Sequence, residues 1–83
     1  MSERFYIVAK NTTEGKHKHN DSETTATFRE GMDLLKTLLS MGESGTIYTC
    51  EYKSENTSMY DVLYFREYKN ILGKLTLMER GNL

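Results

Sequence analysis

The sequence of 83 residues contains no proline and no tryptophan, and it has a single cysteine, Cys50. Average usage predicts about four prolines in a chain of this length, so the turns have to be formed by glycine, asparagine, aspartate and serine. One thiol cannot form a disulfide within the chain, and no Cys-x-x-Cys or Cys/His cluster offers zinc ligands. A core this small therefore depends on packing, and association with a second copy or a partner would stabilise it further.

Long apolar runs and an excess of charge of one sign are also absent. The first residues, MSERFYIVAK, include charged side chains and no apolar stretch of signal-peptide length, and no other segment approaches a membrane span. We therefore expect a cytoplasmic protein with no membrane contact. Eleven basic and twelve acidic side chains leave a formal charge of −1, which argues against a strongly basic nucleic-acid-binding domain and against an acidic DNA mimic.

Apolar periodicity predicts one strand and one helix in the first half of the chain. Residues 4–10 (RFYIVAK) are apolar on both faces of an extended chain, which is typical of a strand inside a sheet. Thr27 and Glu30 fit a capping box. The apolar residues that follow recur at helical spacing, so we predict a helix over about residues 28–41, with Gly42 as its C-terminal stop.

The second half of the chain alternates between polar and apolar residues, and short polar turns interrupt it. This pattern predicts an antiparallel strand meander over about residues 46–80. The polar segment 11–23 forms either a long loop or a hairpin whose second arm follows it. We predict one α+β domain over residues 1–83, in the order β-(β)-α-β-β-β. One amphipathic helix covers one face of a mostly antiparallel sheet of four or five strands.

The two histidines lie in the polar segment, within GKHKHND at residues 15–21. In an extended chain His17 and His19 point to the same side and could meet one cation, but no further Cys/His cluster completes a zinc site. The same segment offers positive charge to a phosphate or an acidic surface, although Glu14 and Asp21 reduce its field. We expect no metal and no cofactor, and we interpret the segment as a secondary contact loop formed by Lys16, His17, Lys18 and His19.

Five tyrosines and one arginine fall on one parity of two neighbouring predicted strands. If the helix covers the other parity, which includes Ile47, Leu63 and Phe65, these side chains form an exposed aromatic patch of the kind found in binding surfaces. The predicted partner-binding residues are Tyr48, Tyr52, Tyr60, Tyr64, Arg66 and Tyr68. Two other interpretations stay open: cross-strand tyrosine pairs that only stabilise the sheet, and a homodimer surface.

No combination of residues predicts catalysis. Cys50 stands in mid-strand between two tyrosines, where a buried thiol is more common than a reactive one. The acidic residues Glu51, Asp61 and Glu67 are typical strand-face charges. The chain contains no P-loop, no GxSxG and no HExxH. We therefore expect a protein that is not an enzyme and has no catalytic residues.

The whole pattern resembles small accessory proteins of bacteriophages, including the anti-CRISPR group: an MSERFYIVAK-type first strand, one Thr-capped helix, a tyrosine-rich meander and no catalytic motif. This resemblance implies a non-enzymatic inhibitor that binds and blocks a host protein or nucleoprotein complex in the host cytoplasm. The alternative is a small nucleic-acid-binding regulator that stacks bases on the tyrosines and contacts phosphates through Lys16, Lys18 and Arg66. A homodimer is compatible with both.

Overall fold

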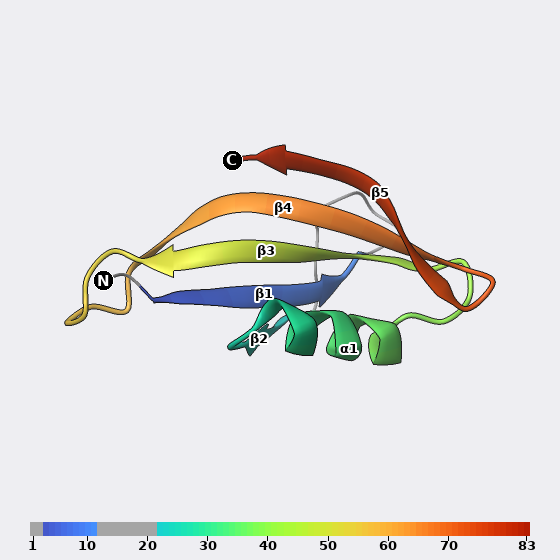
Figure 1. The fold of residues 1–83 in the computed structure, drawn as a ribbon, viewed down its shortest axis with the longest axis horizontal. Coiled ribbons are helices and arrows are strands. Elements are labelled where there is room, and N and C mark those ends of the chain that lie inside the picture. The colour runs from blue at the N-terminus through green and yellow to red at the C-terminus, as the bar shows by residue number, and fades with distance from the viewer. Residues whose placement is uncertain (1–2, 12–21) are drawn as a thin grey trace.

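The computed structural model describes residues 3–11 and 22–83, which form one helix and five strands. All neighbouring strands run antiparallel, and their order across the sheet is β2-β1-β3-β4-β5 (Figure 1). The predicted α+β class and element order are therefore confirmed. The elements are β1 (Arg4–Lys10), β2 (Ser22–Thr25), α1 (Phe28–Leu38), β3 (Ser44–Tyr52), β4 (Tyr60–Ile71) and β5 (Lys74–Asn82).

β1 lies inside the sheet, as its sequence indicates. It pairs with β2 along one edge and with β3 along the other. Val8 and Ala9, which point to opposite faces, are both fully buried.

β2 is the arm that returns after the polar segment. The predicted contact loop, residues 16–19, lies outside the described residues, so its role stays a prediction.

α1 begins at the predicted capping box. The Thr27 hydroxyl accepts a hydrogen bond from the Glu30 N–H at 3.1 Å, and the Glu30 carboxylate accepts one from the Thr27 N–H at 3.2 Å. These two bonds satisfy amide donors that the first helical turn leaves without a partner. α1, the helix that residues 3–11 and 22–83 form, is not long and apolar enough to cross a membrane.

The predicted end of the helix is wrong by three residues, because α1 stops at Leu38 and not near residue 41. Leu39 adopts an extended conformation (φ −94°, ψ 120°) that places its side chain in the core, where it is 4% exposed. The Asn70 amide, from a distant strand, donates to the Leu39 carbonyl at 2.9 Å. Gly42 lies in the turn that follows, with φ +85°. The hydrogen bond from Asn70 thus ends α1 before the helical spacing of apolar residues in the sequence ends.

The core lies between α1 and one face of the sheet, toward β1 and β3. Figure 1 shows α1 lying along the β1–β2 side of the molecule, away from β5. Gly45 on β3 lets the helix end approach closely: a Cβ there would lie 2.5 Å from Leu35 Cδ1 and 2.8 Å from the Ala9 carbonyl oxygen. The buried cluster consists of Val8, Leu35, Leu39, Ile47 and Tyr68.

The capping box predicts that alanine substitution destabilises the protein more at Thr27 than at Thr37, two threonines that are both exposed. Thr27→Ala removes the acceptor for the Glu30 N–H, so we expect the free energy of unfolding to fall by about 1 kcal/mol. Thr37→Ala is the matched control, since the Thr37 hydroxyl bonds only the Asp33 carbonyl within the helix and alanine is the better helix former. Urea denaturation with an unchanged m value measures both. Equal losses in the two variants would contradict a role for the box.

Candidate protein-binding surface

A bulge on β4 divides the six predicted partner-binding residues between two faces of the sheet. Thr49 pairs with Tyr64, but the next residue, Cys50, pairs with Val62, so Leu63 has no partner on β3. One extra residue reverses which face the neighbouring side chains occupy. The prediction that all six share one face is therefore wrong. Tyr48, Tyr52 and Tyr60 lie on the face remote from α1, whereas Tyr64, Arg66 and Tyr68 lie on the face that α1 partly covers.

On the α1 face, Tyr68 belongs to the core. Its side chain is 7% exposed, and burial raises the pKa of its phenol. The Arg66 guanidinium carbon lies 4.8 Å from the centre of the Phe28 ring and 4.7 Å from that of Tyr64, which are favourable cation–π distances. Tyr68 thus supports the fold, while Arg66 is held between aromatic rings at the border of the helix.

The remote face carries an aromatic cluster at its β3–β4 end. The Phe5 ring centre lies 4.6 Å from that of Tyr52 and 5.1 Å from that of Tyr60, the latter in an edge-to-face arrangement. Such pairs stabilise a sheet. Because Tyr60 is 43% exposed and Met59 beside it is more exposed still, the cluster also offers contact area to another molecule.

The middle of the remote face is buried and shows no reactive group. Cys50 is fully buried, and burial raises the pKa of its thiol above the ordinary value of 9.0. Burial, and then the charge of Glu67, raise the pKa of the Tyr48 phenol. In the part of the chain that the structure describes, no three His, Cys, Asp or Glu side chains come together as metal ligands.

Glu67 is buried, and the expectation of an ordinary strand-face charge is wrong for it. Its side chain is 6% exposed, and its carboxylate accepts a hydrogen bond from Asn11 Nδ2 at 2.8 Å. The Asn11 oxygen in turn accepts from the Thr46 hydroxyl at 2.8 Å, and Asn11 Nδ2 also donates to the Ser44 hydroxyl. Asn11 therefore fixes the end of β1 to β3 and β4 and satisfies a carboxylate that burial would otherwise destabilise.

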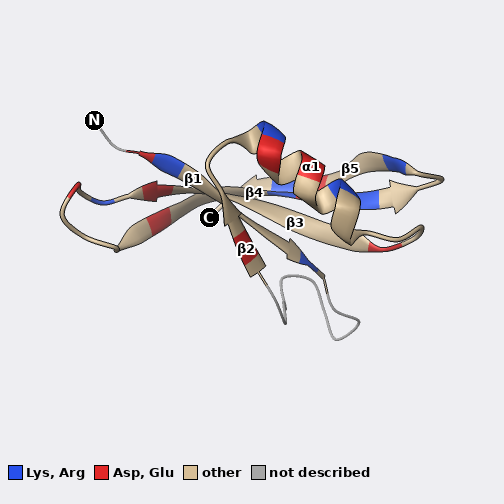
Figure 2. Ribbon diagram, turned by 90° about the horizontal axis from the view of Figure 1, so that it is seen from below, with Lys and Arg blue, Asp and Glu red and all other residues tan. Residues whose placement is uncertain are grey.

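The β4–β5 hairpin and the turn beside it carry many of the exposed large apolar side chains among the described residues. Since α1 lies over the β1 side of the sheet, the hairpin extends beyond the helix (Figure 1). Acidic and basic residues are interspersed along α1 and the strands (Figure 2). The exposed apolar residues here are Ile71, Leu72, Leu77 and Met78 on the hairpin, with Leu38 and Met41 at the α1–β3 turn.

The turn at the tip of this hairpin places a leucine, Leu72, at a position with positive φ. Leu72 and Gly73 form its two-residue turn, with φ values of 54° and 86°, and Ile71 pairs with Lys74 across it. Positive φ at both positions defines a type I′ turn, in which asparagine, aspartate or glycine is usual at the first. A leucine there costs about 1–2 kcal/mol, and the 83% exposed side chain gains little packing in return. The sequence marks a turn at this point but not the strain at Leu72.

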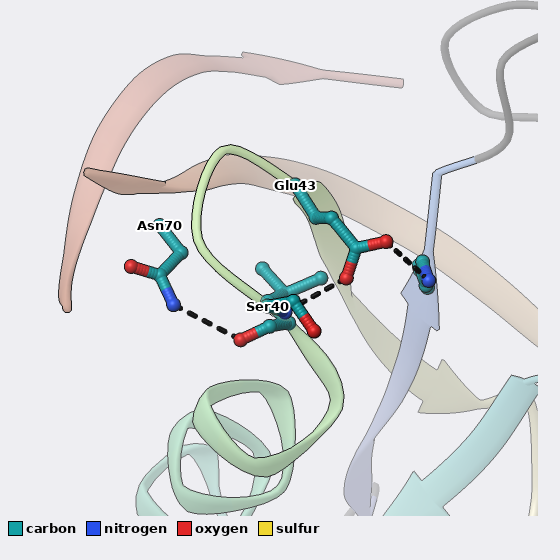
Figure 3. Close-up of polar contacts among 5 residues, drawn as sticks. Ser40, Glu43 and Asn70 are labelled. Atoms are coloured by element: carbon teal, nitrogen blue, oxygen red, sulfur yellow. Dashed lines mark hydrogen bonds and ion pairs between the residues drawn. The ribbon is translucent and has the colours of Figure 1, made fainter. Parts of the chain in front are cut away.

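A polar network fixes the tip to the end of α1 (Figure 3). Asn70 donates to the Leu39 carbonyl at 2.9 Å, its side-chain oxygen accepts from the Gly73 N–H at 2.8 Å, and its backbone exchanges hydrogen bonds with the α1–β3 turn. In that turn the Glu43 carboxylate accepts from the Ser40 N–H at 2.7 Å and pairs with Lys10 of β1. The hydrogen bond from Lys10, and then that from Ser40, lower the pKa of Glu43.

No family model matches the chain, and no match is found among curated proteins or solved structures.

The buried thiol and phenols predict a loss of stability at alkaline pH. The pKa values of Cys50, Tyr48 and Tyr68 are raised in the folded protein, so the unfolded chain releases these protons at a lower pH than the folded chain does. Their stabilising contribution is complete below the unfolded values of 9.0 and 10.0 and is lost as pH rises toward the folded values. Urea denaturation from about pH 7 to about pH 11 measures this decline.

In Cys50→Ala we expect the decline to begin about one pH unit later, because the first group to ionise in the unfolded chain is removed. The comparison uses the shape of the stability curve, since the smaller side chain also changes the stability at neutral pH. Rapid reaction of the native Cys50 thiol with a thiol reagent at neutral pH would contradict its burial.

Proposed function

We propose that this chain is a non-enzymatic binding protein that attaches to a host protein or nucleoprotein complex and blocks the surface it covers. The proposal agrees with the anti-defence inhibitors of phages that its sequence resembles. The observation that carries it is Leu72, an exposed apolar side chain held at positive φ. Strain that no packing among the described residues offsets is typical of sites that act on another molecule.

The rigid tip has the properties of a binding anchor. Asn70 and the Gly73 turn hold it in one position, so little conformational entropy is lost when a partner covers it. Leu72 is the most exposed of the large apolar side chains among the described residues, and its neighbour in the chain, Ile71, is also exposed. An apolar side chain presented in this way fits a pocket on the partner, where a few fully desolvated residues supply most of the binding energy.

The charged side chains next to the tip indicate which charges should surround the pocket on the partner. Lys74 follows the turn directly and Lys69 precedes it by three residues, and both are exposed. Neither is close enough to an acidic side chain of the described residues to form an ion pair. We therefore expect carboxylates around an apolar pocket of the partner, which would speed association and favour this partner over others.

The predicted tyrosine surface becomes a second contact region in this proposal. The Phe5, Tyr52 and Tyr60 cluster and the hairpin tip lie at opposite ends of the long axis of the molecule (Figure 1), whose longest extent is 42 Å. A partner that contacts both ends would have an extended surface blocked. A homodimer through either end is also compatible with a core of this size.

A substitution at the tip tests the proposal. Leu72→Asn places a residue that tolerates positive φ at the strained position, so we expect the unfolding free energy to rise by about 1 kcal/mol. Capture of a partner from bacterial lysate should fall at least tenfold, on the order of the loss of one binding hot spot. Leu83→Asn makes the same change at an exposed apolar residue outside the tip and serves as the control.

The capture is carried out with and without nuclease. Capture that resists nuclease, requires Leu72 and tolerates Leu83→Asn is the expected result. Undiminished capture by the more stable Leu72→Asn variant would refute the tip as an anchor. Complete release by nuclease would favour the alternative, a nucleic-acid-binding regulator, over direct binding of a protein.

A further inference from the structure

Two arginines face each other across the β4–β5 hairpin. Arg66 on β4 and Arg80 on β5 are direct partners in the antiparallel register, so both side chains lie on the α1 face. Like charges directly opposite each other destabilise a sheet. Neither guanidinium forms an ion pair with an acidic side chain of residues 3–11 or 22–83. Among these described residues, therefore, no ion pair neutralises the two positive charges.

The structure also holds one of the two guanidinium groups in place. Phe28 from α1 and Tyr64 from β4 both lie against Arg66, at 4.8 and 4.7 Å from its Cζ. Both distances are within cation–π range, and a guanidinium carries five N–H donors, so donors remain for a further ligand. The Thr49 hydroxyl first, and then Arg66 and Arg4, lower the pKa of Tyr64.

We propose that Arg66 and Arg80 form a binding site for a phosphate group. Directly opposed residues in antiparallel strands have Cα atoms about 4.5–5.5 Å apart, so both guanidinium groups can reach one small anion. Asn82, two residues beyond Arg80 and opposite Tyr64, adds a neutral amide donor on the same face. Arg80 is exposed and Arg66 is half-buried, so the site is open to solvent on one side and supported by α1 on the other.

The geometry favours phosphate over a carboxylate. Each guanidinium presents a fork of N–H donors that two oxygens satisfy, and a carboxylate has only two oxygens to share between two forks. A phosphate group offers three or more acceptor oxygens and up to two negative charges, and it removes the repulsion between the arginines. A nucleic-acid backbone and a small phosphorylated molecule supply the same chemistry. The site does not depend on the hairpin tip, so it stands apart from the proposed anchor at Leu72.

Arg80→Glu separates binding from folding. This change places a carboxylate opposite Arg66, so we expect a higher melting temperature than wild type at low salt. Inorganic phosphate, titrated against sodium chloride of equal ionic strength, should raise the melting temperature of the wild type in a saturable way. In Arg80→Glu the affinity for phosphate, measured by calorimetry, should fall at least tenfold, on the order of one lost charge-assisted interaction.

Lys74→Glu is the matched control, because it reverses one positive charge on the same strand, at the turn end where Lys74 pairs with Ile71. It should retain the phosphate effect. Equal phosphate responses in wild type and Arg80→Glu, or none in wild type, would overturn the proposal. So would tighter binding of a glutamate-rich peptide than of phosphate.

Two further ligands identify the source of the phosphate. A short single-stranded oligonucleotide that binds the wild type more tightly than inorganic phosphate does, and loses that advantage in Arg80→Glu, assigns the site to a nucleic-acid backbone. Binding of a mononucleotide or inorganic phosphate with no gain for the oligonucleotide assigns it to a small phosphorylated molecule. Both results support a phosphate site. The Leu72→Asn variant should behave as wild type in each titration, which distinguishes failure of this site from failure of the proposed anchor.

Discussion

The structure depends on one asymmetric contact, the packing of a single short helix against one side of a five-stranded sheet. A helix of 11 residues is about 16 Å long and about 10 Å wide, whereas five strands spaced about 4.8 Å apart form a sheet about 20 Å wide. One helix cannot cover such a face. Leu35 and Leu39 therefore build the core over Val8 and Ile47, and β4 and β5 continue past it with Tyr68 as the last buried residue near the helix. The exposed apolar surface and the unpaired charges are consequences of this incomplete coverage.

Polar contacts replace apolar packing where the helix no longer reaches. Asn70 connects the hairpin to the end of α1 through the Leu39 carbonyl and to its own turn through the Gly73 N–H. Glu43 connects the adjacent turn to β1 through Lys10. The hairpin is thus positioned by hydrogen bonds of defined length and direction, and this makes it suitable for presenting Leu72 in a fixed orientation. The same contact at Leu39 ends the helix early, so helix length and tip position have a common cause.

Two features of the hairpin oppose the stability of the isolated chain. Leucine at positive φ is strained, and arginine opposite arginine is repulsive. Neither is offset by packing or by an ion pair among the described residues, and local conflicts of this kind concentrate at sites of function. A partner that buries Leu72 and a phosphate that bridges Arg66 and Arg80 would each relieve one of them. The proposed nucleoprotein target would engage both at once.

Local sequence patterns were enough to predict the β1 strand, the capping box at Thr27, the start of α1 and the antiparallel meander. These follow from periodicity and from residues close together in the chain, which act before any tertiary contact forms. The register between strands, in contrast, depends on tertiary contacts and could not be predicted from the sequence. Leu63 carries no local sign that it will be left out of the pairing with β3, yet this one residue moves Tyr64, Arg66 and Tyr68 to the α1 face and leaves Tyr52 and Tyr60 on the other. The meeting of Arg66 with Arg80, and of Asn70 with Leu39, has the same origin, because strand pairing brings together residues whose separation in the chain gives no indication of their contact.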